Sequence, residues 1–494
     1  MFSTVLSAAM VGIDPTPVRV ETHIGSGRPS FCVVGLPDTA VREARDRVRA
    51  ALATTGFPFP ARRVTVNLAP ADIPKGGSAY DLPIALSILV ADRVLPEDAA
   101  TGVALGELAL DGSLRPVRGG LAAGIVAGSV GEPCILPPLS ATEAAAVPGV
   151  EVRAARTLSE AVAVAKHRHR GAPIPEPTPT TPEEDLVDLA MVRGQESARR
   201  ALEVGAAGGH HLLLWGPPGV GKTMLARALP GLLPPLADEA ALEVSQVWSA
   251  SGRARPISRR PPLRRPHHTT SLAALIGGGS GFPQPGEISL AHRGLLFLDE
   301  LGEFPRHLLD ALRQPLEDRT VVIARRGGTG VFPCDVQLVA ATNPCPCGFK
   351  DDSRQACGCS QAVQQRYRRR LSGPLLDRFD IRLPIRRPDK ESYFGIRSEP
   401  SHEVKARVVA ARARQLDRRV LNRNLDGPAL DDQPYTPEAK GLLKSAFDGL
   451  GGRGFDRVRR VARTVADLGG GDEISEGHVA EALAFRSELW AAKH

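Results

Sequence analysis

Residues 212–229, LLLWGPPGVGKTMLARAL, decide the fold of this chain of 494 residues. Within them, Gly216 to Thr223 match the pattern G-x-x-x-x-G-K-[ST], between an apolar run and a helix-favouring run. In this strand–loop–helix context, backbone amides surround phosphate groups, Lys222 reaches the β- and γ-phosphates, and the Thr223 hydroxyl binds Mg²⁺. A glycine- and proline-rich turn without a ligand is the alternative, and the flanking runs disfavour it. The residues expected to contact the nucleotide are Gly216, Pro217, Pro218, Gly219, Val220, Gly221, Lys222 and Thr223.

Two later apolar runs also end in polar residues. GLLFLDE predicts a buried strand that brings Asp299 to the Mg²⁺ shell and Glu300 to the attacking water. QLVAATNPC predicts another strand, after which Asn343 orients the same water. Each run alone is also compatible with a strand that ends in solvated acids or in an asparagine turn. Their order after the phosphate loop favours one ATP-hydrolysing site.

The overall composition is that of a globular protein with a weak preference for a polyanionic partner. The net charge is +7 and the pI about 9.2, and aromatic residues make up only 4%, which disfavours base stacking as the main binding device. No stretch approaches the roughly 18 apolar residues of a membrane helix, and the first residues lack the basic segment of a signal peptide. We therefore expect a cytoplasmic protein without membrane contact.

Composition shifts divide the chain into four parts. Short β-rich and helical runs alternate over 1–165, and a proline-rich linker covers 166–187. Strand–helix alternation with the nucleotide motifs covers 188–385, which predicts an α/β fold with a mostly parallel sheet. Helical patterns dominate 386–494.

Four of the seven cysteines gather directly after Asn343. They form two C-x-C pairs, and four thiolates suit a tetrahedral Zn²⁺ that has no open position for catalysis. The spacing departs from the common C-x₂-C knuckle, so free thiols or redox-labile pairs are the alternative. A metal here would brace the loop that carries Asn343. The four residues, in the segment 345–359, are Cys345, Cys347, Cys357 and Cys359.

Longer strings resemble one family over nearly the whole chain. RPHHTTSLAALIGGG, PQPGEISLAHRGLLFLDELGEF, ATNPCPCGF and LSGPLLDRFDI are similar to the ComM subfamily (YifB/ComM-like) of magnesium-chelatase-like AAA+ ATPases. The resemblance implies an N-terminal Lon-protease-like (ribosomal-S5-like) α+β domain, an AAA+ P-loop α/β domain with a parallel sheet, and a C-terminal helical lid. It also implies a homo-oligomeric ring, a hexamer in this subfamily, that uses ATP and Mg²⁺ and acts on single-stranded or branched DNA.

The same resemblance assigns roles outside the three motifs. Arg378 in LLDRFD matches the arginine finger that reaches the γ-phosphate of a neighbouring subunit; a salt bridge to Asp377 or Asp380 is the alternative. The lid string GGRGFDRVRR is expected to supply a sensor arginine, either Arg453 or Arg457. The residues that match the adenine-flanking segment are Val192, Gly194 and Gln195.

Two basic segments are candidate DNA contacts. TVVIARRGGTGVFPCDVQL predicts a β-hairpin with Arg325 and Arg326 at its tip, similar in position to the pore hairpin of related rings; a solvated tip is the alternative. SGRARPISRRPPLRRPHHTTS carries six arginines, as in an electrostatic track for nucleic acid, and pairing with acids of neighbouring subunits is the alternative. Its adjacent histidines, His267 and His268, are expected to be structural rather than metal ligands.

The N-terminal strings IPKGGSAYDLPIAL and GELALDGSLRPVRGG resemble the Lon protease domain. Active members pair a serine nucleophile with a lysine that activates it. This chain has Ala79 and Leu121 at the two matching positions, with Ser78 one place away and Lys75 in a different motif. We therefore expect the fold without the peptidase, and a role in ring assembly or DNA contact by analogy.

These features favour an ATP-driven helicase that promotes branch migration of DNA in recombination or natural transformation. A magnesium-chelatase-type motor that remodels a protein or tetrapyrrole complex is the alternative, although it needs a partner subunit with a metal-binding adhesion domain. Ala79 and Leu121 argue against a protease, and the intact Lys222, Asp299 and Glu300 argue against a non-catalytic scaffold.

Overall fold

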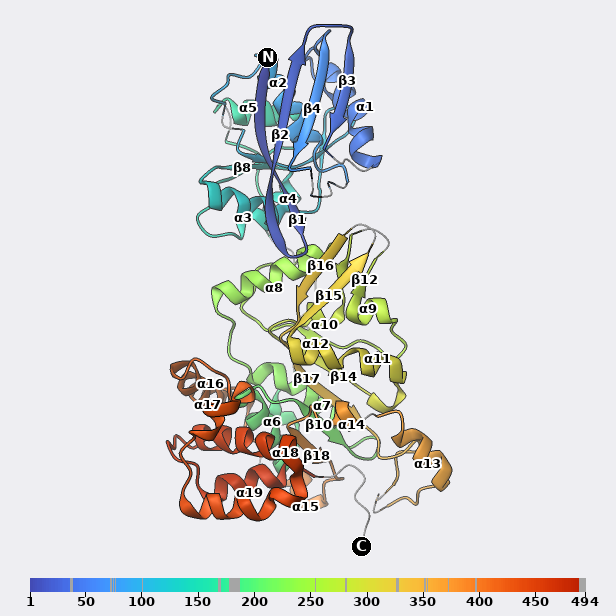
Figure 1. Cartoon of the computed structure of the whole chain (residues 1–494), viewed down its shortest axis with the longest axis vertical. Helices are drawn as coiled ribbons and strands as arrows, with labels where there is room; N and C mark the ends of the chain where they lie inside the picture. Colours follow the sequence, from blue (N-terminus) through green and yellow to red (C-terminus); the bar gives the residue numbers. More distant parts are fainter. Residues whose placement is uncertain are drawn as a thin grey trace.

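The chain forms an elongated molecule in this computed structural model, with the N-terminal part at one end of the long axis (Figure 1). Arg326 and residues 177–186 of the expected linker lie outside the described residues. No helix in the described part of the chain is long and apolar enough to cross a membrane. The structure describes residues 1–35, 39–71, 73, 75, 77–99, 101–167, 170–176, 187–253, 255–279, 282–325, 328–350, 352, 354–371, 373–395 and 398–487.

A mixed sheet with the strand order β3-β4-β2-β1-β5-β8-β9 forms the N-terminal part. Its strands are β1 (Phe2–Val11), β2 (Asp14–Gly25), β3 (Ser30–Val34), β4 (Arg63–Ala69), β5 (Val103–Ala104), β8 (Cys134–Leu136) and β9 (Val152–Ala154), and β6 (Glu107–Leu108) pairs with β7 (Leu114–Arg115). The helices are α1 (Thr39–Thr54), α2 (Asp81–Ala91), α3 (Gly120–Val130), α4 (Pro138–Ala145) and α5 (Leu158–Ala165).

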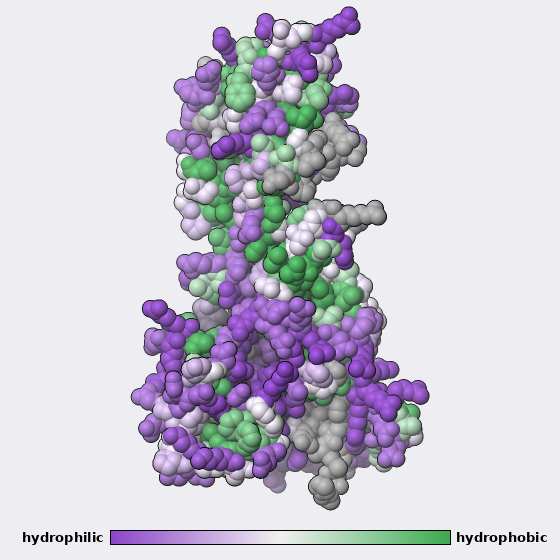
Figure 2. All heavy atoms as spheres, viewed as in Figure 1, coloured by the Kyte–Doolittle hydropathy of each residue, from purple (hydrophilic) through white to green (hydrophobic). Residues whose placement is uncertain are grey.

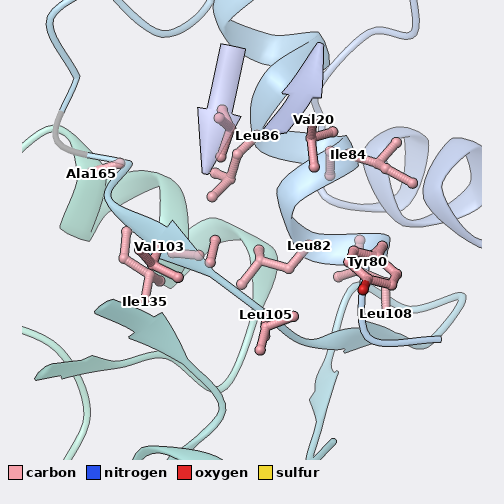
Figure 3. Close-up of a cluster of buried hydrophobic side chains, with 14 of the residues drawn as sticks. Val20, Tyr80, Leu82, Ile84, Leu86, Val103, Leu105, Leu108, Ile135 and Ala165 are labelled. Carbon is pink, nitrogen blue, oxygen red and sulfur yellow. The ribbon is translucent and has the colours of Figure 1, made fainter. Parts of the chain in front are cut away.

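Helix α2 is the centre of the N-terminal core. Apart from Asp81 and Ser87 it is apolar on every side, and all of its residues are buried, so it packs inside the domain rather than on its surface. Figure 3 shows Leu82, Ile84 and Leu86 of this helix among Val20 and Val103 of the sheet. The alternating burial of β4 supplies the inward face of the sheet.

A parallel sheet of five strands with the order β11-β14-β17-β10-β18 forms the central domain. The strands are β10 (Leu212–Trp215), β11 (Leu263–Arg264), β14 (Leu295–Leu298), β17 (Gln337–Thr342) and β18 (Ile381–Pro384). β10, β14 and β17 are buried throughout, which explains their unbroken apolar runs. The sequence therefore predicted the α/β class and the parallel sheet correctly.

Short helices and two hairpins surround this sheet. The helical segments are η1 (Leu189–Met191), α6 (Glu196–Gly208), α7 (Lys222–Ala228), η2 (Leu229–Leu232), α8 (Asp238–Ala250), α9 (Leu272–Ile276), α10 (Glu287–Leu290), η3 (Leu301–Glu303), α11 (Arg306–Ala311), α12 (Arg313–Asp318), α13 (Gln361–Arg368) and α14 (Gly373–Leu376). The hairpins are β12 (Gly277–Gly278) with β13 (Gln284–Pro285), and β15 (Thr320–Arg325) with β16 (Gly328–Pro333).

The C-terminal part is helical, as expected. It contains α15 (Lys390–Phe394), α16 (Ser401–Asp417), η4 (Asn422–Asn424), α17 (Gly427–Asp431), α18 (Pro437–Leu468) and α19 (Glu476–Ala484). Gly451 interrupts α18 with φ of 64° and ψ of 165°. Val458 and Val461 of α18 share one core with Leu212 and Leu214 of β10, so the lid is packed against the sheet.

The turn between β1 and β2 joins the N-terminal part to the central domain. Ile13 packs against the apolar cluster of Val244 and Trp248 and also against the core beneath the β15–β16 hairpin. Figure 2 shows apolar side chains where the two parts meet. This contact places the N-terminal part directly above α8 and the hairpin (Figure 1).

An ion pair between the half-buried Arg47 and the buried Asp81 fixes α1 against α2, with N–O distances of 2.7 and 3.0 Å. Burial raises the pKa of Asp81, while Arg47 acts in the opposite direction. We predict that Arg47→Ala lowers the free energy of unfolding of the N-terminal part by about 3–5 kcal/mol, because it leaves a charge buried without its partner. Hydrogen exchange of the α2 amides in urea measures this locally.

The matched control is Arg45→Ala, which removes an exposed pair with Asp46. Its cost is expected to stay within about 0.5 kcal/mol. Equal costs for the two variants would contradict the assignment of the Arg47 pair as a structural lock.

Candidate functional site

The phosphate loop begins at the carboxyl end of β10, an interior strand of the parallel sheet between β17 and β18. A Cβ atom at Gly216 would approach the carbonyl oxygen of Ile385 to 2.1 Å, so this position has no room for a side chain. Gly219 and Gly221 adopt positive φ angles of 77° and 91°. Helix α7 begins at Lys222. The backbone therefore has the shape that the motif requires around phosphates.

Lys222 is held by three oxygen atoms. Its ammonium donates to the carbonyl oxygens of Gly216 (2.6 Å) and Pro217 (2.8 Å) and to Oδ1 of Asn343 (3.0 Å). Burial lowers the pKa of Lys222 to about 8, although the charges of Asp299 and Glu300 act in the opposite direction. The structure thus brings the lysine of the phosphate loop to the asparagine at the end of β17.

The two acids that follow β14 lie at the same edge of the sheet. The Thr223 hydroxyl donates to Oδ2 of Asp299 at 2.8 Å, and the backbone amide of Glu300 donates to Oδ1 of Asp299 at 2.9 Å. Glu300 adopts the left-handed conformation, with φ of 51° and ψ of 47°. A non-glycine residue in this region is strained, and such strain is common at functional sites.

His268 contacts Glu300, which the sequence did not indicate. Nδ1 of His268 lies 3.3 Å from Oε2 of Glu300, and its ring meets Phe304 edge to face. His267 instead pairs with Thr269. We expected a structural role for both histidines; the contact makes His268 a positioning candidate for Glu300. Nothing in the basic sequence around the two histidines indicated that His268, rather than His267, would contact Glu300.

The adenine-flanking segment reaches the phosphate loop through Gln195. Its side-chain amide donates to the carbonyl oxygens of Val220 (3.3 Å) and Arg386 (2.7 Å). Val192 is buried, and Gly194 has a positive φ of 61°. The three residues therefore lie beside the site, and their contact with adenine stays a prediction.

The predicted arginine finger and sensor arginines gather at the opposite edge of the sheet. Arg457 donates to Oδ1 of Asp380 at 2.5 Å and to the carbonyl oxygen of Arg378 at 3.0 Å. Arg378 is buried and forms its salt bridge with Glu317, not with Asp377 or Asp380, the partners considered in the sequence analysis. Burial lowers the pKa of Arg378, and the nearby charge of the exposed Arg453 acts in the same direction.

This edge lies one strand length away from the phosphate loop of the same chain. Asp380 accepts a hydrogen bond from the amide of His211, just before β10, whereas the phosphate loop follows Trp215 at the other end. Four strand residues span roughly 13 Å. A polar cavity of about 180 Å³ lies here, lined in part by Arg378 and Arg457.

The β15–β16 hairpin has the predicted form but ends earlier than expected, at Pro333. Arg325 is exposed at its tip, next to Arg326, which lies outside the described residues. Val322 and Val331 pair across the strands and are 66% and 51% exposed. The hairpin therefore presents a charged tip and an apolar outer face, and DNA contact stays a prediction.

Several arginines of the basic segment 251–271 pair with acids of their own chain. Arg264 forms two bonds with Glu287, at 2.5 and 2.8 Å, and Arg259 pairs with Asp238 at 2.7 Å. Arg264 also lies over the ring of Trp248. Arg265 is exposed. The segment is thus partly neutralised within the chain, which reduces its capacity as a DNA track.

The four clustered cysteines meet in space. Their sulfur atoms all lie within 4.8 Å of one another. Cys345 is buried and the other three are half-buried. The chemistry of this donor set therefore fits a metal ion.

The two positions that match the catalytic pair of the Lon protease domain lie near the central domain. Ala79 lines a cavity of about 290 Å³ together with Arg118 and Ser249 at the end of α8. Leu121 is buried at the start of α3. Ser78 donates to Glu107, so the neighbouring serine has an acid rather than a lysine as its partner. Alanine and leucine at the two matching positions offer no nucleophile and no base.

The fold and the site define an AAA+-like P-loop protein. Models of the magnesium chelatase subunit ChlI match residues 188–393 and 20–139, and a model of its C-terminal region matches 398–486. The chain is 44% identical to an uncharacterized protein of Mycobacterium tuberculosis, with 97% of each chain covered. It is 42% identical to YifB of Escherichia coli and 40% identical to competence protein ComM of Haemophilus influenzae, with 98% of this chain and 97% of each relative covered.

The chain therefore belongs to the ComM/YifB-like subfamily of magnesium-chelatase-like proteins, which confirms the resemblance seen in the sequence. Two more distant matches cover less of it. Lon protease 2 of Bacillus subtilis is 33% identical over 26% of this chain. The magnesium-chelatase 38 kDa subunit of Cereibacter sphaeroides is 25% identical over 58% of this chain.

The lowered pKa of Lys222 predicts a pH dependence of nucleotide affinity. Below pH 8 the free protein carries the ammonium that triphosphate oxygens need, and above pH 8 that charge is lost. We expect the apparent Kd for ATP to rise about tenfold between pH 7 and pH 9. Titration with a fluorescent nucleotide measures it.

Lys222→Arg, which stays charged over this range, is the control, and its affinity should change little with pH. Lys222→Ala is expected to abolish turnover. The same pH slope in the Arg variant as in the native chain would show that another group is responsible.

Proposed function

We propose that this chain is the subunit of a hexameric ring motor that hydrolyses ATP and promotes branch migration of DNA in recombination or natural transformation. The observation that carries the ATPase activity is the convergence of Lys222, Thr223, Asp299 and Asn343 through direct hydrogen bonds at one sheet edge. The membership of this chain in the family supports the general function of an ATP-driven motor. The similarity to a competence protein favours DNA as its substrate.

ATP and Mg²⁺ are the ligands that this donor set fits. The Thr223 hydroxyl and the Asp299 carboxylate already point at one another, as expected for groups that share a hard cation. Lys222 would exchange its carbonyl partners for phosphate oxygens, and Glu300 would polarise the attacking water. Mg²⁺ would neutralise phosphate charge at this edge. The four cysteines would hold a structural Zn²⁺.

A ring explains why three arginines lie far from the phosphate loop of their own chain. Arg378, Arg453 and Arg457 gather at the opposite edge of the sheet, beside a polar cavity. In a head-to-tail ring, one edge of each subunit faces the other edge of its neighbour. Arg378 would then stabilise charge on the neighbour's γ-phosphate.

Mixing inactive variants tests this arrangement. We predict that Arg378→Ala and Lys222→Ala each lack ATPase activity alone, because each removes one half of a shared site. An equimolar mixture should regain about one quarter of the native rate, since one interface in four then combines an intact lysine with an intact arginine. Steady-state phosphate release measures it. Recovery that fails although both variants assemble into rings would show that Arg378 does not act across the interface.

The exposed hairpin tip supports contact with DNA. Arg325 carries no acidic partner among the described residues, whereas Arg264 and Arg259 of the basic segment are paired within the chain. An unpaired guanidinium is free to bind a phosphate group. The buried residues of the hairpin also share one core with β14, the strand that Asp299 follows.

We predict that Arg325→Ala together with Arg326→Ala weakens DNA binding and lowers its salt dependence. For single-stranded DNA, each lost phosphate contact reduces the slope of log affinity against log salt by about 0.7. Binding and ATPase stimulation by single-stranded and forked DNA are measured at several salt concentrations. Lys444→Ala removes an exposed charge of the lid as a control.

If the hairpin variant shows the same slope of log affinity against log salt as the native chain, the hairpin does not contact DNA. An ATPase that ignores DNA altogether would favour the second candidate, a magnesium-chelatase-type motor that remodels a protein or tetrapyrrole complex. The similarity to a magnesium-chelatase subunit is the observation behind that candidate.

A further inference from the structure

The loop that follows β17 is long and irregular. Residues 344–360 contain no helix or strand among those that the structure describes. A loop of this length without regular structure is uncommon in a compact domain unless it is functional or cross-linked. In the middle of the loop, Asp352 forms an ion pair with Arg387 at 3.0 Å. The remaining candidate for a cross-link is the cysteine cluster.

The sulfur positions match one tetrahedral ion. The distances between sulfur atoms are 3.4 Å for Cys345–Cys347, 3.6 Å for Cys345–Cys357 and 3.5 Å for Cys347–Cys357. A tetrahedral Zn²⁺ with Zn–S bonds of about 2.3 Å places its sulfur ligands about 3.8 Å apart. A disulfide would need about 2.05 Å. The arrangement therefore has the size of a metal site and is too wide for disulfides.

Groups around the sulfurs are arranged as in a thiolate site. The backbone amide of Gly348 donates to the carbonyl oxygen of Cys345 at 2.9 Å, and the Gln364 side chain donates to the carbonyl oxygen of Cys359 at 3.1 Å. The Gln364 side chain of α13 reaches the sulfur of Cys357 at 3.7 Å. Such outer contacts orient the ligands.

This loop also touches the nucleotide site directly. Gly348, with φ of 84°, packs so closely on the phosphate loop that a Cβ atom would lie 2.6 Å from Cδ of Pro218 and 3.7 Å from Cγ of Asn343. Cys345 follows Asn343 by two residues, and Asn343 accepts the bond from Lys222. The cysteine cluster therefore lies next to the two groups that position Lys222. These are the phosphate loop, which contains Lys222, and the side chain of Asn343, which accepts its hydrogen bond.

We propose that a zinc ion bound by the four cysteines positions Asn343 and Pro218, so that metal loading controls the rate of ATP hydrolysis. The control of hydrolysis rests on the proposed ATPase function, while the metal site and its effect on local order do not. Zn²⁺ would displace the thiol protons on binding. Loss of the metal would release Gly348 from Pro218 and let Asn343 leave Lys222, so that the phosphate loop becomes less ordered while Lys222 and Thr223 still bind the nucleotide.

The test compares protein as purified, protein stripped with a chelator, and stripped protein reloaded with Zn²⁺. We expect about one zinc per chain by elemental analysis. Stripping should speed hydrogen exchange of the amides in 216–221 and 343–350, and reloading should reverse this. Turnover should fall about ten- to hundredfold, with the Kd for nucleotide within about threefold. A general loss of folding would instead abolish nucleotide binding as well.

Substitutions make the same comparison without a chelator. Cys357→Ser should lose the metal and the turnover, whereas Cys357→His, which keeps a zinc ligand, should retain both. Cys32→Ser, an exposed thiol outside the cluster, should change neither. Both cluster substitutions leave the chain next to Asn343 unaltered.

Three outcomes would overturn the inference. They are a native chain that binds no zinc, unchanged exchange of 216–221 after metal removal, or full turnover in the zinc-free Cys357→Ser variant. If the native chain hydrolyses no ATP, the proposed function fails, and the metal content and exchange data still decide whether zinc orders the site.

Discussion

The parallel pairing of β10 with β17 and β18 is the constraint on which the arrangement of this protein depends. Because parallel strands end on the same side, the phosphate loop, the acids after β14 and Asn343 all reach one edge of the sheet. The same pairing sends the residues that precede β18 and β10 to the other edge, where Arg378 and Arg457 gather. One sheet therefore separates the nucleotide edge from the arginine edge by a strand length, and in the proposed ring a complete site would combine these two edges from neighbouring copies of the chain.

This geometry also explains which features the sequence could predict. Asp299 and Asn343 each follow an unbroken apolar run, and an apolar run of four to six residues within a strand–helix alternation predicts a buried parallel strand. Once the strands are parallel, their carboxyl ends must meet, so the grouping with Lys222 follows from topology alone. The helical lid followed from its amphipathic periods, although the break at Gly451 depends on one backbone conformation.

Contacts made by loops could not be predicted in this way. His268 meets Glu300, Arg378 meets Glu317 and Gly348 packs on a proline of the phosphate loop, and in each case at least one partner lies outside the regular periodicity. Their pairing depends on the path of irregular backbone and on side-chain rotamers. The Lon-like strings similarly predicted an inactive N-terminal domain. They did not indicate that the cavity lined by Ala79 would face the end of α8.

In the free protein, each reactive group at the nucleotide edge already has an internal partner. Lys222 is satisfied by three oxygens, Thr223 by Asp299, and Glu300 by His268. Burial of an ammonium without such partners would cost free energy. The lowered pKa of Lys222 indicates that the surrounding oxygens offset only part of this cost. On the proposed function, nucleotide binding would exchange these bonds, and Asn343 would lose its hydrogen bond with Lys222. Because the cysteine loop follows Asn343 directly, the proposed zinc ion and the nucleotide edge would then be linked through this one side chain.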